Sequence, residues 1–103
     1  MKTVFISGPM TGLPDNNYSE FFRVEKLLRD VGYSVVNPAS IGVRDGWEWR
    51  DYMTQSLMML LTRDVDAVVT LDGWERSKGA SLEVYVARAL GMDVVSAHEL
   101  LRR

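Results

Sequence analysis

The stretch "SKGASLEVYVARALGMDVV", residues 77–95, decides the fold, because it joins a helical pattern directly to a strand pattern. Gly91 ends the helical part, and Met92 to Val95 form a short apolar run. Residues 30–36 repeat this order, with Asp-Val-Gly leading into Tyr-Ser-Val-Val. Such helix-to-strand joints are typical of βαβ units, in which the strands are parallel.

Four short apolar runs are expected to form the strands of this sheet. They are nearly continuous in apolar character, as in parallel strands that are covered on both faces. The four runs are residues 3–6, 33–36, 67–71 and 92–95. The pattern therefore predicts an α/β fold with a parallel sheet of about four strands, and helices precede the second, third and fourth strands.

The first of these helices is predicted between the first two strands. Asn17 and Glu20 have the spacing of a capping box, and Gly32 suits the left-handed position after a helix end. The apolar stripe of this helix consists of Phe21, Val24 and Leu28.

The second helix is predicted over residues 47–62. Its expected core face consists of Met53, Leu57, Leu60 and Leu61. Tyr52 and Met59 lie away from that face, with Met58 on the other flank. Because a chain of this size rarely leaves such a surface in water, we expect a homo-oligomer contact around Tyr52 and Met59. The alternative is that flexible methionines fill gaps under a loop.

Length and composition restrict the class of protein. A chain of 103 residues is one domain, residues 1–103, with 47% apolar and 25% charged residues, as in ordinary globular proteins. The formal charge of −2, without a run of Lys or Arg, does not favour a nucleic-acid polymer as partner. Cysteine is absent, the apolar runs are too short to span a bilayer, and the first residues are strand-like rather than a signal peptide. We therefore expect a cytoplasmic protein without disulfides.

The segments that follow the strands are the candidate binding site, because ligands of open parallel sheets bind beyond the carboxyl ends of the strands. After the first strand comes "SGPMTGLPDNN", residues 7–17, rich in Gly, Pro and hydroxyl groups. It matches neither a dinucleotide fingerprint nor a Walker A loop. An ordinary Pro/Gly loop is the alternative. After the second strand, Asn37 is the first residue that a polar ligand edge would meet, although Asn-Pro also favours a plain turn.

The third loop contains Asp72, Gly73 and Trp74, and leads through Ser77 and Gly79 into the helix that carries Glu83. A helical wheel with Leu82 at its centre puts the buried arc on Tyr85, Val86, Ala89 and Leu90. Glu83 then lies about 100° from Leu82, at the margin of the core. Partial burial would raise its pKa, whereas the helix amino terminus would lower it. The alternative role of Glu83 is to complement the helix dipole.

Several motifs together resemble a known family. They are "KTVFISGPMTG", "VVNPA", "DVDAVVTLDGW" and above all "SKGASLEVYVARALG". The chain resembles the nucleoside 2-deoxyribosyltransferases, and most closely the short, largely uncharacterised deoxyribosyltransferase-like proteins of phages and prophages. The specific pattern of the short group is Gly-Trp-x-x-Ser-x-Gly-Ala-x-x-Glu, which is residues 73–83 here.

The resemblance implies a role for Glu83. In the transferases, the matching Glu is the nucleophile that attacks the anomeric carbon of a deoxynucleoside as the base leaves. A carboxylate suits this step because it can form a covalent glycosyl ester, as in retaining glycosidases. Two residues of this chain depart from the pattern of the transferases. Phe5 replaces the tyrosine that orients the nucleophile, and Ser77 stands where an aspartate often lies, so Asp72 is the candidate substitute acid. A solvated turn acid is the alternative for Asp72.

We therefore expect a compact Rossmann-like or flavodoxin-like three-layer sandwich that performs N-glycosidic chemistry, either 2-deoxyribosyl transfer or hydrolysis, on a nucleoside or nucleotide. Glu83 and Asp72 are the catalytic candidates. The binding candidates are Ser7, Gly8, Pro9, Met10, Asn37, Trp74, Ser77 and Gly79. No cofactor and no metal site are expected, because one His with scattered acids does not make a ligand cluster.

Two other functions stay open. The first is a non-catalytic nucleotide-binding or regulatory protein that retains the pocket, which the missing hydroxyl and acid favour. The second is an interaction protein that works through the Met-rich helix.

Overall fold

The sheet at the centre of the protein is parallel throughout. The computed structural model describes residues 2–102, and within them four strands are ordered β2-β1-β3-β4. Their bounds are Thr3–Ser7 for β1, Ser34–Val36 for β2, Ala67–Thr70 for β3 and Asp93–Ser96 for β4. The four predicted strands are confirmed with end shifts of one residue, and so is the parallel α/β class.

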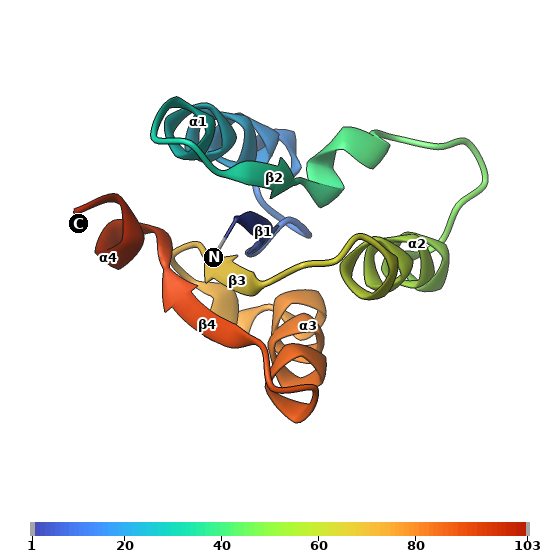
Figure 1. The fold of residues 1–103 in the computed structure, drawn as a ribbon. Coiled ribbons are helices and arrows are strands. Elements are labelled where there is room, and N and C mark those ends of the chain that lie inside the picture. The colour runs from blue at the N-terminus through green and yellow to red at the C-terminus, as the bar shows by residue number, and fades with distance from the viewer. Residues whose placement is uncertain (1, 103) are drawn as a thin grey trace.

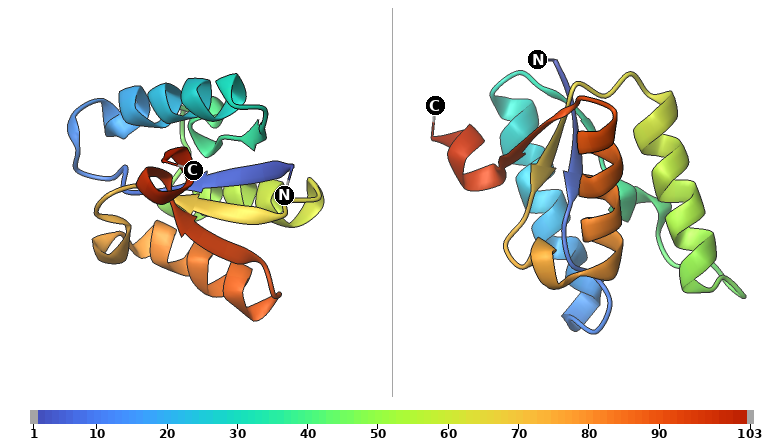
Figure 2. Two further views of the ribbon diagram at one scale, coloured as in Figure 1. Left: turned by 60° about the vertical axis from the view of Figure 1, so that its left-hand side comes forward. Right: turned by 90° about the horizontal axis from the view of Figure 1, so that it is seen from below.

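Helices cover both faces of the sheet and complete a three-layer sandwich (Figures 1 and 2). α1 and α4 lie on one face, while α2 and α3 lie on the other. Their bounds are Tyr18–Asp30 for α1, Trp49–Thr62 for α2, Lys78–Ala89 for α3 and Ala97–Leu101 for α4. Three short 3-10 turns follow strands or precede helices in the described chain: η1 (Pro14–Asn17), η2 (Pro38–Ile41) and η3 (Trp74–Arg76).

Alternate side chains of the central strands pack into two separate cores, as the period of two in a strand requires. Val4 and Ile6 of β1 point toward α1 and α4, where they meet Phe21, Val24 and Leu28. Phe5 points the other way, toward α2 and α3, and joins Leu60, Val68 and Val84. The predicted stripe of α1 is confirmed, because Phe21, Val24 and Leu28 are all buried.

The start of α1 differs from the prediction. No capping box forms between Asn17 and Glu20, since Glu20 is paired with Arg23 and the Asn17 side chain donates to the carbonyl oxygen of Pro9. Asp15 takes the capping role, accepting from the backbone amide and the hydroxyl of Ser19. The end of the helix agrees with the prediction, because Gly32 has a φ of 105°.

The buried face of α2 was only partly predicted. The helix begins at Trp49 rather than at residue 47, with a capping box between Glu48 and Asp51. Met53 and Leu60 are buried as expected, but Leu61 is exposed. Met59 is 4% exposed and belongs to the core, so its expected place on an outer surface is wrong, while the homo-oligomer contact of this helix stays a prediction.

The buried face of α3 was predicted wrongly. Leu82, Tyr85 and Leu90 are exposed, whereas Ala80, Glu83, Val84 and Ala87 face the interior. Small side chains at positions 80 and 87 let the helix backbone approach the sheet closely. Glu83 therefore lies inside the buried face rather than at its margin.

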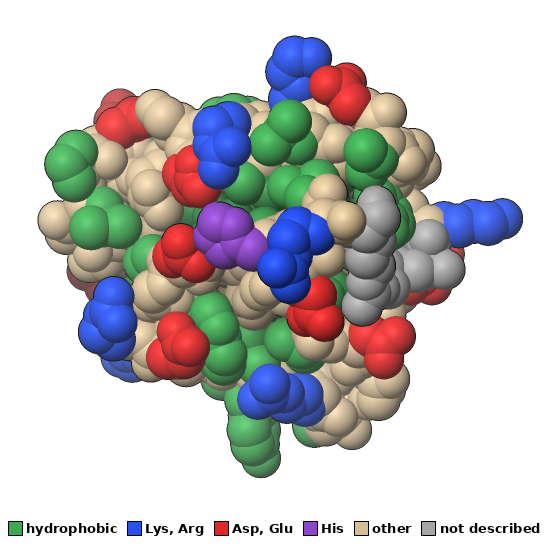
Figure 3. All heavy atoms as spheres, turned by 90° about the vertical axis from the view of Figure 1, so that its left-hand side faces the viewer, with side chains coloured by type: hydrophobic (Ala, Val, Ile, Leu, Met, Phe, Trp, Pro, Cys, Tyr) green, Lys and Arg blue, Asp and Glu red, His purple; other side chains and the backbone are tan. Residues whose placement is uncertain are grey.

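The side of the molecule that carries α4 and the carboxyl terminus has a mixed surface (Figure 3). Acidic and basic side chains alternate with apolar ones there, and no broad area of one charge is visible. Within residues 2–102, no helix combines the length and apolar character that crossing a bilayer requires.

Candidate active site

A cleft of about 1020 Å³ opens beyond the carboxyl ends of β1 and β3. Its walls come from the loop after β1, the region that follows η2, the first half of α2 and the start of α3. This is the edge of the sheet at which the sequence predicted a ligand site. The cleft is large enough for a small organic ligand.

Glu83 is the buried acid of this cleft. Its side chain lines the cleft, yet the residue is only 5% exposed. Ser7 donates a hydrogen bond of 2.6 Å to Oε1, and Ser56 donates one of 2.5 Å to Oε2. Both carboxylate oxygens are therefore held in fixed positions by hydroxyl groups from two different elements.

Burial raises the pKa of Glu83 to about 7. Removal of the carboxylate from water is the largest cause, and the hydrogen bonds from Ser56 and Ser7 oppose it by stabilising the charged form. A carboxylate with this pKa is present in both protonation states at neutral pH. Hydroxyl groups can donate or accept, so the two serines can hold either state in place.

The two serines reach Glu83 because of their positions on β1 and α2. Ser7 is the last residue of β1 and is fully buried. Ser56 lies on the buried face of α2, one turn after Met53 and one turn before Leu60. Phe5, which lacks the hydroxyl that the resemblance requires, packs in the core on the α2 and α3 side. The hydroxyl groups that hydrogen-bond to Glu83 in this chain belong to Ser7 and Ser56.

Asp72, the other catalytic candidate, lines the outer part of the cleft. Its side chain is 86% exposed, and the ring atom Nε2 of His98 lies 3.2 Å from its Oδ2. Among the residues that line the cleft, Asp72 and Glu83 are the two acids. Asp72 is therefore exposed and lies beside an imidazole, whereas Glu83 is buried and accepts hydrogen bonds from two hydroxyl groups.

Two glycines allow the close approaches that form the cleft. A Cβ on Gly8 would lie 2.7 Å from the Cβ of Leu71, so glycine lets the loop after β1 pass the end of β3. A Cβ on Gly79 would lie 2.9 Å from Sδ of Met53, so glycine lets α3 begin against α2. Both residues line the cleft, together with Pro9 and Met10.

The remaining binding candidates are divided between the cleft and the scaffold. Ser77 lines the cleft, and its hydroxyl also caps α3 by accepting from the amide of Ala80. Asn37 is buried outside the lining residues, where it caps η2 and donates to Glu25. Trp74 also lies outside them, packed on the α2 and α3 core with the Arg88 guanidinium over its ring.

Several lining residues were absent from the sequence candidates. Ser56 is the most informative, and its signal was a small polar residue among Met53, Met59 and Leu60 on one helical face. Lys78 was also missed. Its Nζ lies 4.2 Å from the ring centre of Trp49, and both residues line the cleft. Within residues 2–102, no three His, Cys, Asp or Glu side chains gather where they could hold a metal ion.

Solved structures, but not curated sequences, include a protein similar to this chain. A search of curated protein sequences found no match. Among solved structures, a 2-desoxiribosyltransferase from Leishmania mexicana is similar, with a TM-score of 0.67 and 22% sequence identity. The similarity covers 93% of this chain but 63% of that one, so the chain spans less than two thirds of the larger protein. The expected 2-deoxyribosyltransferase-like fold is thereby confirmed.

A family match covers nearly the whole chain. Residues 2–96 match the family described as domain of unknown function (DUF4406). The chain belongs to the DUF4406 family, and its fold is that of a nucleoside 2-deoxyribosyltransferase.

Proposed function

We propose that the protein breaks the N-glycosidic bond of a deoxynucleoside or its nucleotide, with Glu83 as the nucleophile. The observation that carries the proposal is a single buried carboxylate that lines a large cleft while two serine hydroxyls hold both of its oxygens. Carboxylates in such positions can form a glycosyl ester with the anomeric carbon.

In the proposed step, an ionised Glu83 oxygen attacks the anomeric carbon as the carbon–nitrogen bond breaks. The base leaves with the electron pair of that bond and gains a proton. Water then hydrolyses the glycosyl ester, or a second base attacks it, and either event frees the carboxylate. The hydroxyls of Ser7 and Ser56 keep the carboxylate in one orientation, which lowers the entropy cost of the attack.

Asp72 is the proposed source of the proton for the departing base, with His98 beside it at 3.2 Å. Its place in the outer part of the cleft supports this role, since a base leaving toward solvent passes that region. Gly8, Pro9 and Met10 line the cleft wall on which we propose that the sugar lies. The resemblance of the sequence to the transferases supports the same assignment.

A binding protein without catalysis is the second candidate. One observation favours it: within the described residues 2–102, the acids that line the cleft are Glu83 and the largely exposed Asp72, so this part of the chain places no second buried acid in the cleft. Such a protein would retain a nucleotide in the cleft and leave it intact.

The two candidates are distinguished by incubating the protein with purine and pyrimidine deoxynucleosides and their monophosphates. Chromatography then measures the free base that is released. We expect release by the wild type and by Glu75→Ala, an exposed control acid, and none by Glu83→Ala. Tight binding in calorimetry with no release over hours would support the binding protein, and equal release by Glu83→Ala would remove Glu83 from the mechanism.

A further inference from the structure

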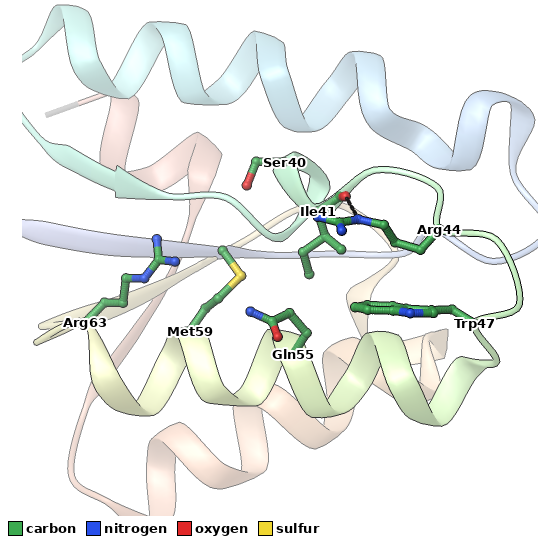
Figure 4. Close-up of a pocket in the computed structure, with 7 residues that line it drawn as sticks. All are labelled: Ser40, Ile41, Arg44, Trp47, Gln55, Met59 and Arg63. Carbon is green, nitrogen blue, oxygen red and sulfur yellow. Dashed lines mark hydrogen bonds between the residues drawn. The ribbon is translucent and has the colours of Figure 1, made fainter.

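A second hollow lies beside α2, and Figure 4 shows the residues that line it. Apart from Ile41, these residues differ from those that line the Glu83 cleft. The volume of the second hollow is about 340 Å³, and it lies between η2 with its following loop and the α2 stripe of Gln55, Met59 and Arg63. We refer to this hollow as the α2 groove. Its volume lies at the lower end of the range for small-molecule sites.

The charged side chains that line the α2 groove are both positive. Arg44 and Arg63 line it from opposite ends, and none of its lining residues among residues 2–102 is acidic (Figure 4). Arg63 makes no hydrogen bond or ion pair with any described residue, and neither does the amide of Gln55. Arg44 uses only its Nε, which donates to the carbonyl oxygen of Ile41 at 3.0 Å. Guanidinium donors at both ends are thus free to bind an anion.

The α2 groove is held in shape by the loop that borders it. The hydroxyl of Tyr52 accepts from the amide of Arg44 at 2.7 Å and donates to the carbonyl oxygen of the same residue at 3.2 Å. The Trp47 ring packs edge-on against Tyr52, and the Arg44 guanidinium lies over that ring. A preformed wall of this kind reduces the ordering cost of ligand binding.

The middle of the groove suits a flat ring rather than a bare anion. The half-buried Ile41 and the largely buried Met59 border the groove there, while the Gln55 amide offers one acceptor and two donors to a polar ring edge. The hydroxyl of Ser40 donates to the carbonyl oxygen of Asn37, so it remains an acceptor toward the groove. The planar guanidinium of Arg63 can bind two phosphate oxygens at once.

We propose that the α2 groove is a second ligand site, which binds a phosphate monoester of a flat polar ring, such as a nucleoside monophosphate. The phosphate binds Arg63, the ring lies against Ile41 and Met59, and the ring edge meets Gln55. Ile41 lines both the groove and the Glu83 cleft, so the two hollows share one side chain.

The test uses methionine methyl groups as separate reporters of the two sites. Met59 lines the α2 groove, whereas Met53 lines the Glu83 cleft. Methyl NMR spectra of Glu83→Gln, which keeps the probe intact, are recorded with a nucleoside 5′-monophosphate, the matching nucleoside and inorganic phosphate. Substitutions of Met53 and Met59 by Leu assign the two signals.

We expect a saturable shift of the Met59 signal with the monophosphate, and weaker binding of both partial probes. Adding Arg63→Ala should weaken the Met59 response by about tenfold or more, because a hydrogen bond to a charged group is lost. The Met53 response should not change with Arg63→Ala. Arg50→Ala is the matched control, since Arg50 is exposed and lines neither hollow.

Three results would overturn the proposal. The first is a Met59 signal that does not move at about millimolar monophosphate, which is the weak end of specific binding. The second is an equal response with Arg63→Ala. The third is an inorganic phosphate response as strong as that of the monophosphate, which would leave no role for the ring.

Discussion

The two acids of the cleft differ in almost every respect except their chemical group. Glu83 is 5% exposed and accepts two serine hydrogen bonds, whereas the Asp72 side chain is 86% exposed and faces an imidazole. Burial raises the pKa of Glu83 to about 7. Position relative to the sheet, rather than residue type, therefore separates a candidate nucleophile from a surface acid.

Replacing each acid by its amide should give the largest difference in activity between the two positions. Glu83→Gln should lower N-glycosidic activity on the order of 10³-fold or more, because the attacking oxygen is lost while the shape stays the same. Asp72→Asn should cost about a hundredfold, the lower end of the range for a proton-transfer group. Base release under identical conditions measures both, and equal losses would mean that the two acids do not have the separate roles proposed.

The pH dependence of stability tests the burial of Glu83 independently of activity. Its pKa is about 7 in the folded state against 4.5 as the ordinary value, so the folded state binds the proton more tightly. The contribution of Glu83 to stability is therefore full below pH 4.5 and is lost as the pH rises through 7. The free energy of unfolding should fall by about 3 kcal/mol over this range through Glu83 alone.

Urea denaturation of the wild type and of Glu83→Gln at pH 4.5 and pH 8 measures this effect. Glu83→Gln lacks the titrating group, so its stability relative to the wild type should increase with pH. A difference between the two proteins that stays constant across the range would mean that the Glu83 carboxyl is hydrated.

A smaller effect is expected when one of the two serine hydroxyls is removed. Ser56→Ala takes away a hydrogen bond that favours the charged form, so the pKa of Glu83 should rise further, by about one unit. The pH at which activity reaches half its maximum should move upward by the same amount. Thr54→Ala, a change on the exposed side of the same helix, is the control. An unchanged pH profile with lower activity would assign Ser56 a packing role only.

The sequence was most informative where the apolar pattern of an element is clear. The strands were predicted because they are short and nearly continuously apolar, and the Phe21, Val24 and Leu28 stripe of α1 was predicted because the polar face of that helix contrasts with it. The predicted ligand edge of the sheet followed from strand direction alone. The resemblance to the transferases added the fold family, which the structural comparison supports.

The helices beside the cleft were predicted less well, because large apolar residues surround them. In α3 a wheel centred on Leu82 chose the bulkier side, but the helix packs through Ala80, Val84 and Ala87. Close packing against the sheet favours small residues, and hydrophobicity alone does not detect that preference. Ser56 was missed for a different reason. Its hydrogen-bond partner Glu83 is 27 residues away in sequence, so no local pattern connects the two residues.

The central claim is that Glu83 bonds covalently to the sugar during turnover. Intact-protein mass spectrometry of the acid-quenched reaction with a deoxynucleoside, followed by peptide mapping, measures this directly. We predict a deoxyribosyl adduct on the peptide that contains Glu83 in the wild type, and none in Glu83→Ala. Sustained release of base by the wild type without an adduct, and at the same rate by Glu83→Ala, would contradict the claim.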